Sequence, residues 1–105
     1  MQTPSAPQEP LTGDCAVRDN PAQRRFELPI NSEAMAVAYY GIEDGHLVLT
    51  HTEVPAAFSG RGIGGRLARG VFEELRRSGR KAILKCPFMG NFFARHPEYA
   101  DVVEG

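Results

Sequence analysis

The sequence is poor in the features that mark specialised protein classes. Cysteine is scarce, with only Cys15 and Cys86, and neither has a cysteine or histidine partner at metal-ligand spacing. A disulfide framework and a zinc site are therefore not expected, and a reducing cytoplasm is the expected location. No run approaches the roughly 18 apolar residues of a membrane-spanning helix. Residues 1–10 lack the basic and apolar regions of a signal peptide, so no leader is expected.

An excess of charge of one sign is missing as well. Twelve Lys and Arg residues against 13 Asp and Glu residues give a formal net charge of −1. This balance excludes a uniformly basic nucleic-acid coat and a long acidic tail. Apolar residues make up 42% of the chain and charged residues 24%, which is typical of globular proteins. A chain of 105 residues forms one domain, whose core is too small to enclose a large cofactor.

The chain divides into a lead-in and a folded part. Residues 1–22 contain few large apolar side chains and four prolines, so we predict a flexible segment there and a folded domain over 23–105. The stretches 24–30, 34–42 and 46–54 are rich in alternating apolar or β-branched residues and predict strands. The short polar turns between them favour an antiparallel meander.

The hydrophobic period then changes. Large apolar residues recur every fourth position from Ile63 to Leu75, which predicts an amphipathic helix that ends at Ser78 and Gly79. A short buried strand over 82–86 and a second helix over about 87–95 follow. Because a helix joins the third and fourth strands, these two should be parallel with a right-handed crossover. The predicted fold class is α+β, a three-strand meander followed by helix, parallel strand and C-terminal helix.

The glycine-rich segment 59–65 is the most informative part of the sequence. It follows a strand and opens a helix, where unpaired main-chain N–H groups and the positive end of the helix dipole attract anions. The glycines satisfy G-x-G-x-x-G, but the segment comes too late in the chain for a dinucleotide fold. Arg66 and Leu67 stand where a P-loop requires Lys and Ser or Thr. A loop that only packs the helix against the sheet is the alternative.

The charge around these glycines favours an anion site. Residues 60–86 contain eight basic and two acidic residues, whereas the rest of the chain contains four basic and eleven acidic ones. Arg61, Arg66 and Arg69 flank the glycines. A solvated helix face explains the later Arg76 and Arg77, but it does not explain Arg61.

At this point the sequence resembles a known family. The order of elements and the run Ser59-Gly60-Arg61-Gly62-Ile63-Gly64 are similar to the GNAT superfamily of N-acetyltransferases, in particular to its small single-domain branch. Further matches span about residues 23–103 and are His51-Thr52-Glu53-Val54-Pro55, Cys86-Pro87-Phe88 and Arg95-His96-Pro97-Glu98-Tyr99. The resemblance implies acetyl-coenzyme A (acetyl-CoA) as cofactor, with its diphosphate on the main-chain amides of the glycine loop.

The resemblance also implies which residues bind this cofactor. The main-chain N–H near Val54 would polarise the thioester carbonyl in a gap between the third and fourth strands. Asn91, on the second helix, would contact the pantetheine or adenosine side. The loop itself would contribute Arg61, Gly62, Ile63, Gly64, Gly65 and Arg66. The chain departs from the family pattern at Ser59, where Gln or Arg is usual, and it lacks the helices that wall the acceptor side in larger relatives.

Three side chains are candidates for the chemistry of acyl transfer, which needs a base for the amine and a group that accommodates the leaving thiolate. His51 and Glu53 are two apart on a strand, so they share a face and either is a candidate base. The alternative to a catalytic role is a hydrogen-bonded histidine of the sheet for His51 and a solvated carboxylate at the strand end for Glu53. Cys86 precedes a helix start, which makes a thiol more reactive. It is an acyl carrier, a proton donor or an inert buried residue.

The sequence therefore predicts an acetyl-CoA-dependent N-acetyltransferase that acts on a primary amine, either a small amine or a protein lysine. A non-catalytic acyl-CoA sensor that uses the same loop is the alternative. Nucleic-acid binding ranks last, because the chain is neutral overall and lacks exposed aromatic residues between its basic ones. No membrane or metal partner is expected, and the expected assembly is a monomer or weak dimer.

Overall fold

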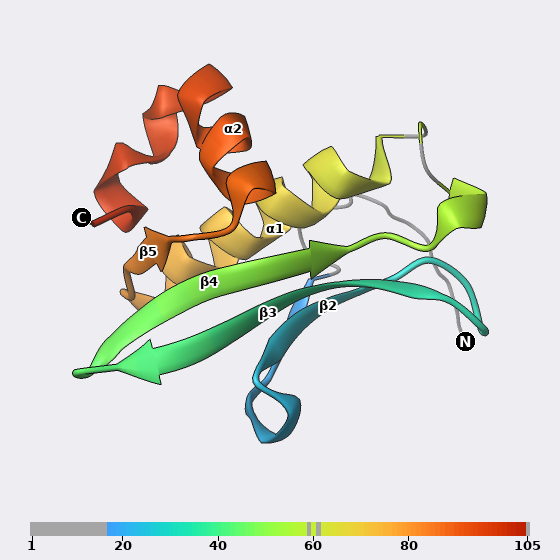
Figure 1. Cartoon of the computed structure of the whole chain (residues 1–105), viewed down its shortest axis with the longest axis horizontal. Coiled ribbons are helices and arrows are strands. Elements are labelled where there is room, and N and C mark those ends of the chain that lie inside the picture. The colour runs from blue at the N-terminus through green and yellow to red at the C-terminus, as the bar shows by residue number, and fades with distance from the viewer. Residues whose placement is uncertain (1–16, 59, 61, 105) are drawn as a thin grey trace, which may run out of the picture.

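A five-stranded sheet forms the centre of the computed structural model, which describes residues 17–58, 60 and 62–104 (Figure 1). The strand order is β1-β2-β3-β4-β5. Strands β1 to β4 pair antiparallel, whereas β5 pairs parallel with β4. The strands are β1 (Arg18–Asn20), β2 (Arg25–Pro29), β3 (Met35–Glu43), β4 (His46–Glu53) and β5 (Ala82–Leu84). The predicted α+β fold with a parallel fourth predicted strand is confirmed.

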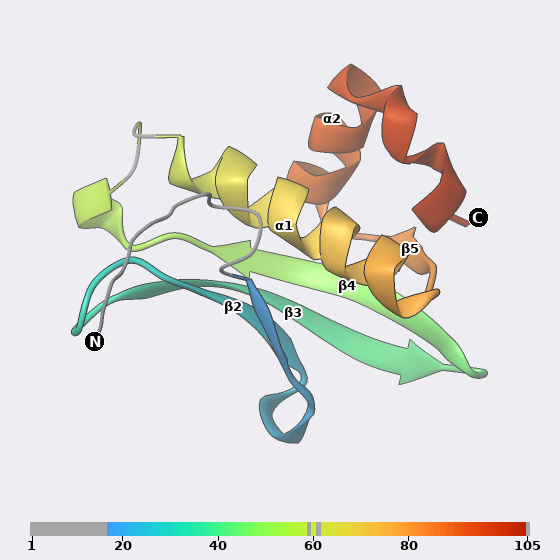
Figure 2. The ribbon, with the colours of Figure 1, turned by 180° about the vertical axis from the view of Figure 1, so that it is seen from behind.

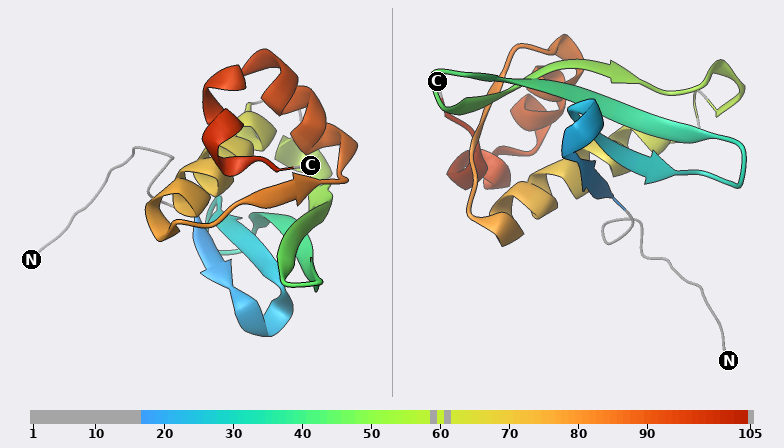
Figure 3. Two further views of the ribbon diagram at one scale, coloured as in Figure 1. Left: turned by 90° about the vertical axis from the view of Figure 1, so that its left-hand side faces the viewer. Right: turned by 90° about the horizontal axis from the view of Figure 1, so that it is seen from below.

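The α-helices lie on one face of this sheet, as the views from opposite sides show (Figures 1 and 2). Neither α-helix covers the other face, which we call the open face, and in the view from below the strands lie in front of the α-helices (Figure 3, right). The α-helices are α1 (Ile63–Ser78) and α2 (Pro87–Arg95), and the 3-10 helices are η3 (Pro21–Gln23), η4 (Ala56–Phe58) and η5 (Pro97–Val102). In the described part of the chain, no helix is long and apolar enough to cross a membrane.

Alternation along the strands places the main apolar cluster on the helix side of the sheet, and Val37 and Val48 are buried on the other side. Successive strand residues point to opposite faces. On β2 and β3, Phe26, Leu28, Ala36 and Ala38 are buried in the main apolar cluster, together with residues of α1 and α2. The intervening residues, such as Arg25 and Tyr39, therefore face the open side. Helix α1 ends where the sequence predicts, because Gly79 adopts φ 73° and donates its N–H to carbonyl oxygens of the last turn.

The folded part begins earlier than the predicted boundary before residue 23. Strand β1 pairs with β2, and Val17 is buried in the core. The Tyr40 hydroxyl donates to Asp19 Oδ1 at 2.7 Å, and the Asn20 amide donates to Glu27 Oε2 at 2.9 Å. The sequence pattern missed β1 because this short edge strand is polar and is held by side-chain contacts rather than by apolar alternation.

Strand β5 is also shorter than predicted and does not reach Cys86. The main-chain N–H groups of Lys85 and Cys86 both donate to the carbonyl oxygen of Leu49, each at 2.9 Å. One carbonyl therefore accepts from two successive residues, which ends the regular parallel ladder. The chain leaves the sheet at this point and enters α2.

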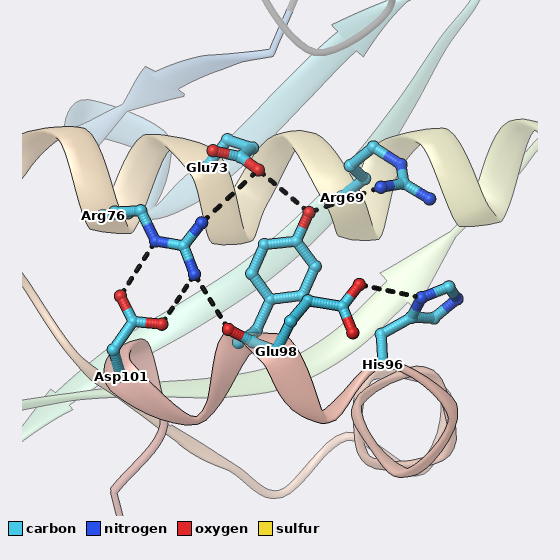
Figure 4. A network of polar contacts seen from close by, with 7 residues as sticks. Arg69, Glu73, Arg76, His96, Glu98 and Asp101 are labelled. Carbon is cyan, nitrogen blue, oxygen red and sulfur yellow. Dashed lines mark hydrogen bonds and ion pairs between the residues drawn. The ribbon is translucent and has the colours of Figure 1, made fainter.

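A polar network fastens η5 to α1 (Figure 4). Arg76 donates to both carboxylate oxygens of Asp101, at 2.8 and 2.6 Å, and to the carbonyl oxygen of Glu98 at 3.0 Å. The buried phenol of Tyr99 donates to Glu73 Oε2 at 2.9 Å, and the Arg76 guanidinium lies 5.0 Å from the centre of its ring. Tyr99 thus packs the C-terminal turn against α1.

This network predicts a pH-dependent contribution to stability. Hydrogen bonding from Arg76 lowers the pKa of Asp101 below its usual 3.8. The ionised form is therefore favoured in the folded chain, and its stabilisation is present above that usual value and is lost as the pH falls through the lowered pKa. Asp101→Asn should lower the thermal unfolding midpoint near about pH 7 by a few degrees, and much less near about pH 2. Thermal melts of both proteins at several pH values test this. A difference between them that does not change with pH would contradict it.

Candidate functional site

The glycine loop opens α1, as predicted. Gly60 and Gly62 have φ values of 79° and 75°, in the left-handed region that favours glycine. The Arg66 N–H donates to the carbonyl oxygen of Gly62 at 3.1 Å, and Gly62 caps the helix without a side chain. The N–H groups of the first helical residues, Ile63, Gly64 and Gly65, precede the first intrahelical bond, so they have no acceptor within the helix.

Open space lies beside three glycines of this loop. A Cβ placed on Gly60, Gly62 or Gly65 would meet no atom within 4 Å, so the space beside these residues is open. The first turn of α1 contains no acidic residue, and Arg66 is exposed in that turn. Amides at a helix start, with no carboxylate to occupy them, suit an anion. Ser59 and Arg61 lie outside the described residues.

Gly64 differs from its neighbours. A Cβ at this position would lie 2.7 Å from Cζ of Phe88, the second residue of α2. Gly64 therefore has a packing role, which was the alternative to anion binding for this loop, because its lack of a side chain lets α2 approach α1 closely. Asn91, the predicted cofactor contact, is exposed further along α2.

Strands β4 and β5 diverge beside this loop. Their pairing is limited to three residues on each strand and ends at Leu49. On the other edge of β4, Tyr39 pairs with His51 and Tyr40 with Leu49, so Thr50 is an extra residue on β4. Such a bulge bends a strand and increases its twist. Beyond Leu49, β4 stays paired with β3 as far as Glu53 but no longer pairs with β5, and we refer to this divergence of β4 and β5 as the gap.

Cys86 is part of the main apolar cluster, and it contacts a residue that the sequence patterns did not single out. The Thr52 hydroxyl oxygen lies 3.1 Å from the sulfur of Cys86, which is 4% exposed. Thr52 pairs with Ala38, which belongs to the core on the helix side of the sheet. The sequence carried no signal for Thr52 beyond its place between two candidate bases, because the contact joins residues 34 positions apart.

His51 and Glu53 share a face, as predicted. His51 Nε2 lies 3.2 Å from Glu53 Oε2, and the two side chains are 60% and 59% exposed. Because strand residues alternate, these side chains lie on the open face of the sheet, opposite to Thr52 and Cys86. The structure thus brings the three predicted catalytic residues to one strand region but divides them between its two faces.

Polar contacts on the open face support the position of His51. The Tyr39 ring stacks on the His51 ring, with centroids 6.2 Å apart, and Arg25 donates to the Tyr39 hydroxyl at 3.4 Å. Arg25 also pairs with the buried carboxylate of Glu27 at 2.7 Å. Hydrogen bonds from Asn20 and Arg25 lower the pKa of Glu27, so this carboxylate stays ionised and keeps Arg25 in place.

A cavity of about 400 Å³ lies at the C-terminal end of β4. Its lining includes the predicted cofactor residue Val54 and the predicted base Glu53, and it also includes Thr52. Val54 is partly buried and packs against the core. The cavity therefore adjoins residues from both faces of β4.

Comparisons with known proteins match most of this chain. The family model described as GCN5-related N-acetyl-transferase matches residues 25–102. The mouse (Mus musculus) protein named Protein NATD1 is 31% identical over 87 residues, which cover 81% of this chain and 79% of the mouse protein. The range that the family model matches includes the glycine loop, the diverging strands and Cys86.

Proposed function

Because the chain belongs to the GCN5-related N-acetyltransferase family, we propose that it transfers an acetyl group from acetyl-CoA to a primary amine, of a small molecule or of a protein lysine. The observation that carries this proposal is the open glycine loop at the start of α1, beside the gap between β4 and β5. When bound, acetyl-CoA supplies an acetyl group activated as a thioester.

The loop binds the diphosphate of this cofactor, and the gap receives its acyl end. The amides of Ile63, Gly64 and Gly65, with the side chains of Arg61 and Arg66, bind the diphosphate. Diphosphate binding at a helix start uses both the free N–H groups and the helix dipole. The main-chain N–H near Val54 donates to the acyl carbonyl oxygen, and Asn91 contacts the pantetheine or adenosine side.

The candidate catalytic residues act from opposite faces of the sheet. On the open face, Glu53 accepts the proton of the amine, directly or through water, while His51 holds its carboxylate or takes this role itself. On the helix side, Cys86 either carries the acetyl group or donates a proton to the departing CoA sulfur. The exposure of His51 and Glu53 leaves room for an acceptor to approach from the open face.

The same exposure favours a second candidate function, a non-catalytic sensor of acyl-CoA. Catalytic sites commonly exclude water, whereas both candidate bases are more than half exposed here. A sensor would bind acetyl-CoA through the same loop without transferring the acetyl group.

Mass spectrometry of the full chain incubated with acetyl-CoA separates these functions. We expect acetylation of at least one amine in a panel of polyamines and lysine peptides, with release of free CoA beyond one molecule per chain only when an acceptor is present. An adduct of acetyl mass on Cys86 would identify it as an acyl carrier. Binding without transfer to any acceptor would support the sensor, and failure to bind acetyl-CoA would contradict both.

A further inference from the structure

We propose that Thr52 is a positioning residue for the Cys86 thiol, which its hydroxyl group holds between β4 and the start of α2. The inference rests on the proposed acetyl transfer, because it concerns how one residue of that site performs its part. Thr52 does not itself exchange a proton or an acyl group with the substrates.

The first support is the contact itself. The Thr52 oxygen and the Cys86 sulfur are 3.1 Å apart, Thr52 is partly buried, and Cys86 is 4% exposed. A hydrogen bond in such a water-poor place is stronger than one at the surface. It therefore constrains the direction in which the thiol points.

The second support is that main-chain pairing and hydrogen bonds fix the backbone of both Thr52 and Cys86. Thr52 pairs with Ala38 in the ladder between β3 and β4, and its β-branched side chain has few rotamers. The Cys86 N–H donates to the carbonyl oxygen of Leu49 at 2.9 Å, and the Cys86 carbonyl oxygen accepts from the Gly90 N–H at 3.0 Å. The hydroxyl and the thiol therefore meet across two rigid elements.

The third support is the cavity of about 400 Å³ at the end of β4. Thr52 lines it together with Glu53 and Val54, which the proposed function assigns to the amine and to the acyl carbonyl. Thr52 thus borders both the space available to a ligand and the buried sulfur of Cys86, which lies on the same face of β4 as Thr52.

Either atom of this contact can be the donor while Cys86 is a thiol, but the reaction steps proposed for Cys86 pass through its thiolate. As a proton donor, Cys86 becomes a thiolate after its proton passes to the CoA sulfur, and it regains the proton that the amine loses. As an acyl carrier, Cys86 first gives up its proton and becomes a thiolate. Its sulfur then bonds to the acetyl carbon while the bond from that carbon to the CoA sulfur breaks. CoA leaves as the thiol with the proton that Cys86 gave up. A thiolate only accepts hydrogen bonds, so in both cases the Thr52 hydroxyl donates to it.

The test compares Thr52→Val, which keeps the shape but removes the hydroxyl, with Thr52→Ser, which keeps the hydroxyl. All proteins carry Cys15→Ser, so that Cys86 is the one remaining thiol. Without any CoA present, we expect Thr52→Val to slow alkylation of Cys86 by iodoacetamide about tenfold at neutral pH, and Thr52→Ser to restore most of the rate. Thr50→Val is the matched control, because Thr50 lies on the same strand and donates to the main-chain oxygen of Tyr39 instead.

Acetyl transfer provides the second measurement. We expect Thr52→Val to lower kcat by a similar factor while the KM for acetyl-CoA changes little, and Thr50→Val to change neither. Equal alkylation rates in Thr52→Val and the parent would overturn the inference, as would a parent thiol that does not react or a failure of Thr52→Ser to restore the rate. If the alkylation effect is found but the parent protein transfers no acetyl group, the proposed function fails while the hold of Thr52 on the thiol stands. An unchanged kcat in Thr52→Val would overturn its role in the reaction.

Discussion

Gly62→Asp should abolish measurable binding of acetyl-CoA and leave the fold intact. The substituted carboxylate would lie at the start of α1, where it can accept hydrogen bonds from the same amides that the diphosphate needs. It would also repel the phosphates. We expect the dissociation constant to rise by about 100-fold or more, which corresponds to roughly 3 kcal/mol of binding free energy. Isothermal titration calorimetry measures it.

The fold should tolerate this change for two reasons. A Cβ at Gly62 meets no atom within 4 Å, so no steric clash arises. The left-handed conformation of this residue is accessible to Asp and Asn, although less readily than to Gly. Thermal unfolding should therefore show a cooperative transition in the variant.

Two further variants separate charge from geometry. Gly62→Asn has nearly the same shape without the charge, and we expect it to weaken binding only about tenfold, by competing for the amides. Gly79→Asp places the same residue in the same left-handed conformation at the opposite end of α1, and should leave binding unchanged. Undiminished affinity in Gly62→Asp would remove the basis for an anion site in this loop.

Local patterns were sufficient for the elements that have strong periodicity or capping residues. The apolar spacing from Ile63 to Leu75 and the glycine after Ser78 define α1, and the structure has both ends where the sequence predicts them. Pro87 at the first turn of α2 and the span to Arg95 are likewise as predicted. These features depend on neighbours within a few residues, which a single sequence contains.

Contacts between distant residues could not be read in the same way. The bond between Thr52 and Cys86 joins residues 34 positions apart, and it forms beyond the bulge at Thr50 and beyond the end of the pairing between β4 and β5. A bulge shifts the register by one residue without a distinctive sequence pattern. Likewise, the glycine pattern suggested one role for the whole loop, whereas the structure gives Gly64 a packing role against Phe88.

Glu53→Gln should nearly abolish acetyl transfer without weakening the binding of acetyl-CoA. Glutamine keeps the size of the side chain and a hydrogen-bond acceptor for His51, but it cannot take a proton from the amine. General base catalysis is worth about 100-fold to 10,000-fold, so we expect kcat to fall by at least about 100-fold. Steady-state kinetics with saturating acetyl-CoA and calorimetric titration of the cofactor measure the two quantities separately.

Glu43→Gln is the matched control, since Glu43 is an exposed carboxylate at the far end of β3 and pairs with Lys85. It should change neither quantity. His51→Gln then distinguishes the two possible bases on the open face. If His51 only orients the carboxylate, its loss should cost much less than the loss of Glu53, whereas a larger loss would make the imidazole the base.

Cys86→Ala tests the helix side of the strand in the same assay. Removal of the thiol eliminates an acyl carrier or a proton donor, so kcat should fall while the dissociation constant of acetyl-CoA stays nearly unchanged. The two variants together decide between an enzyme and a sensor, because they remove groups from opposite faces of β4 and leave the glycine loop intact. If the parent protein transfers acetyl groups and neither variant is slower, the catalytic groups lie elsewhere. If no protein in the series transfers them but all bind acetyl-CoA, these faces of β4 serve recognition rather than proton transfer.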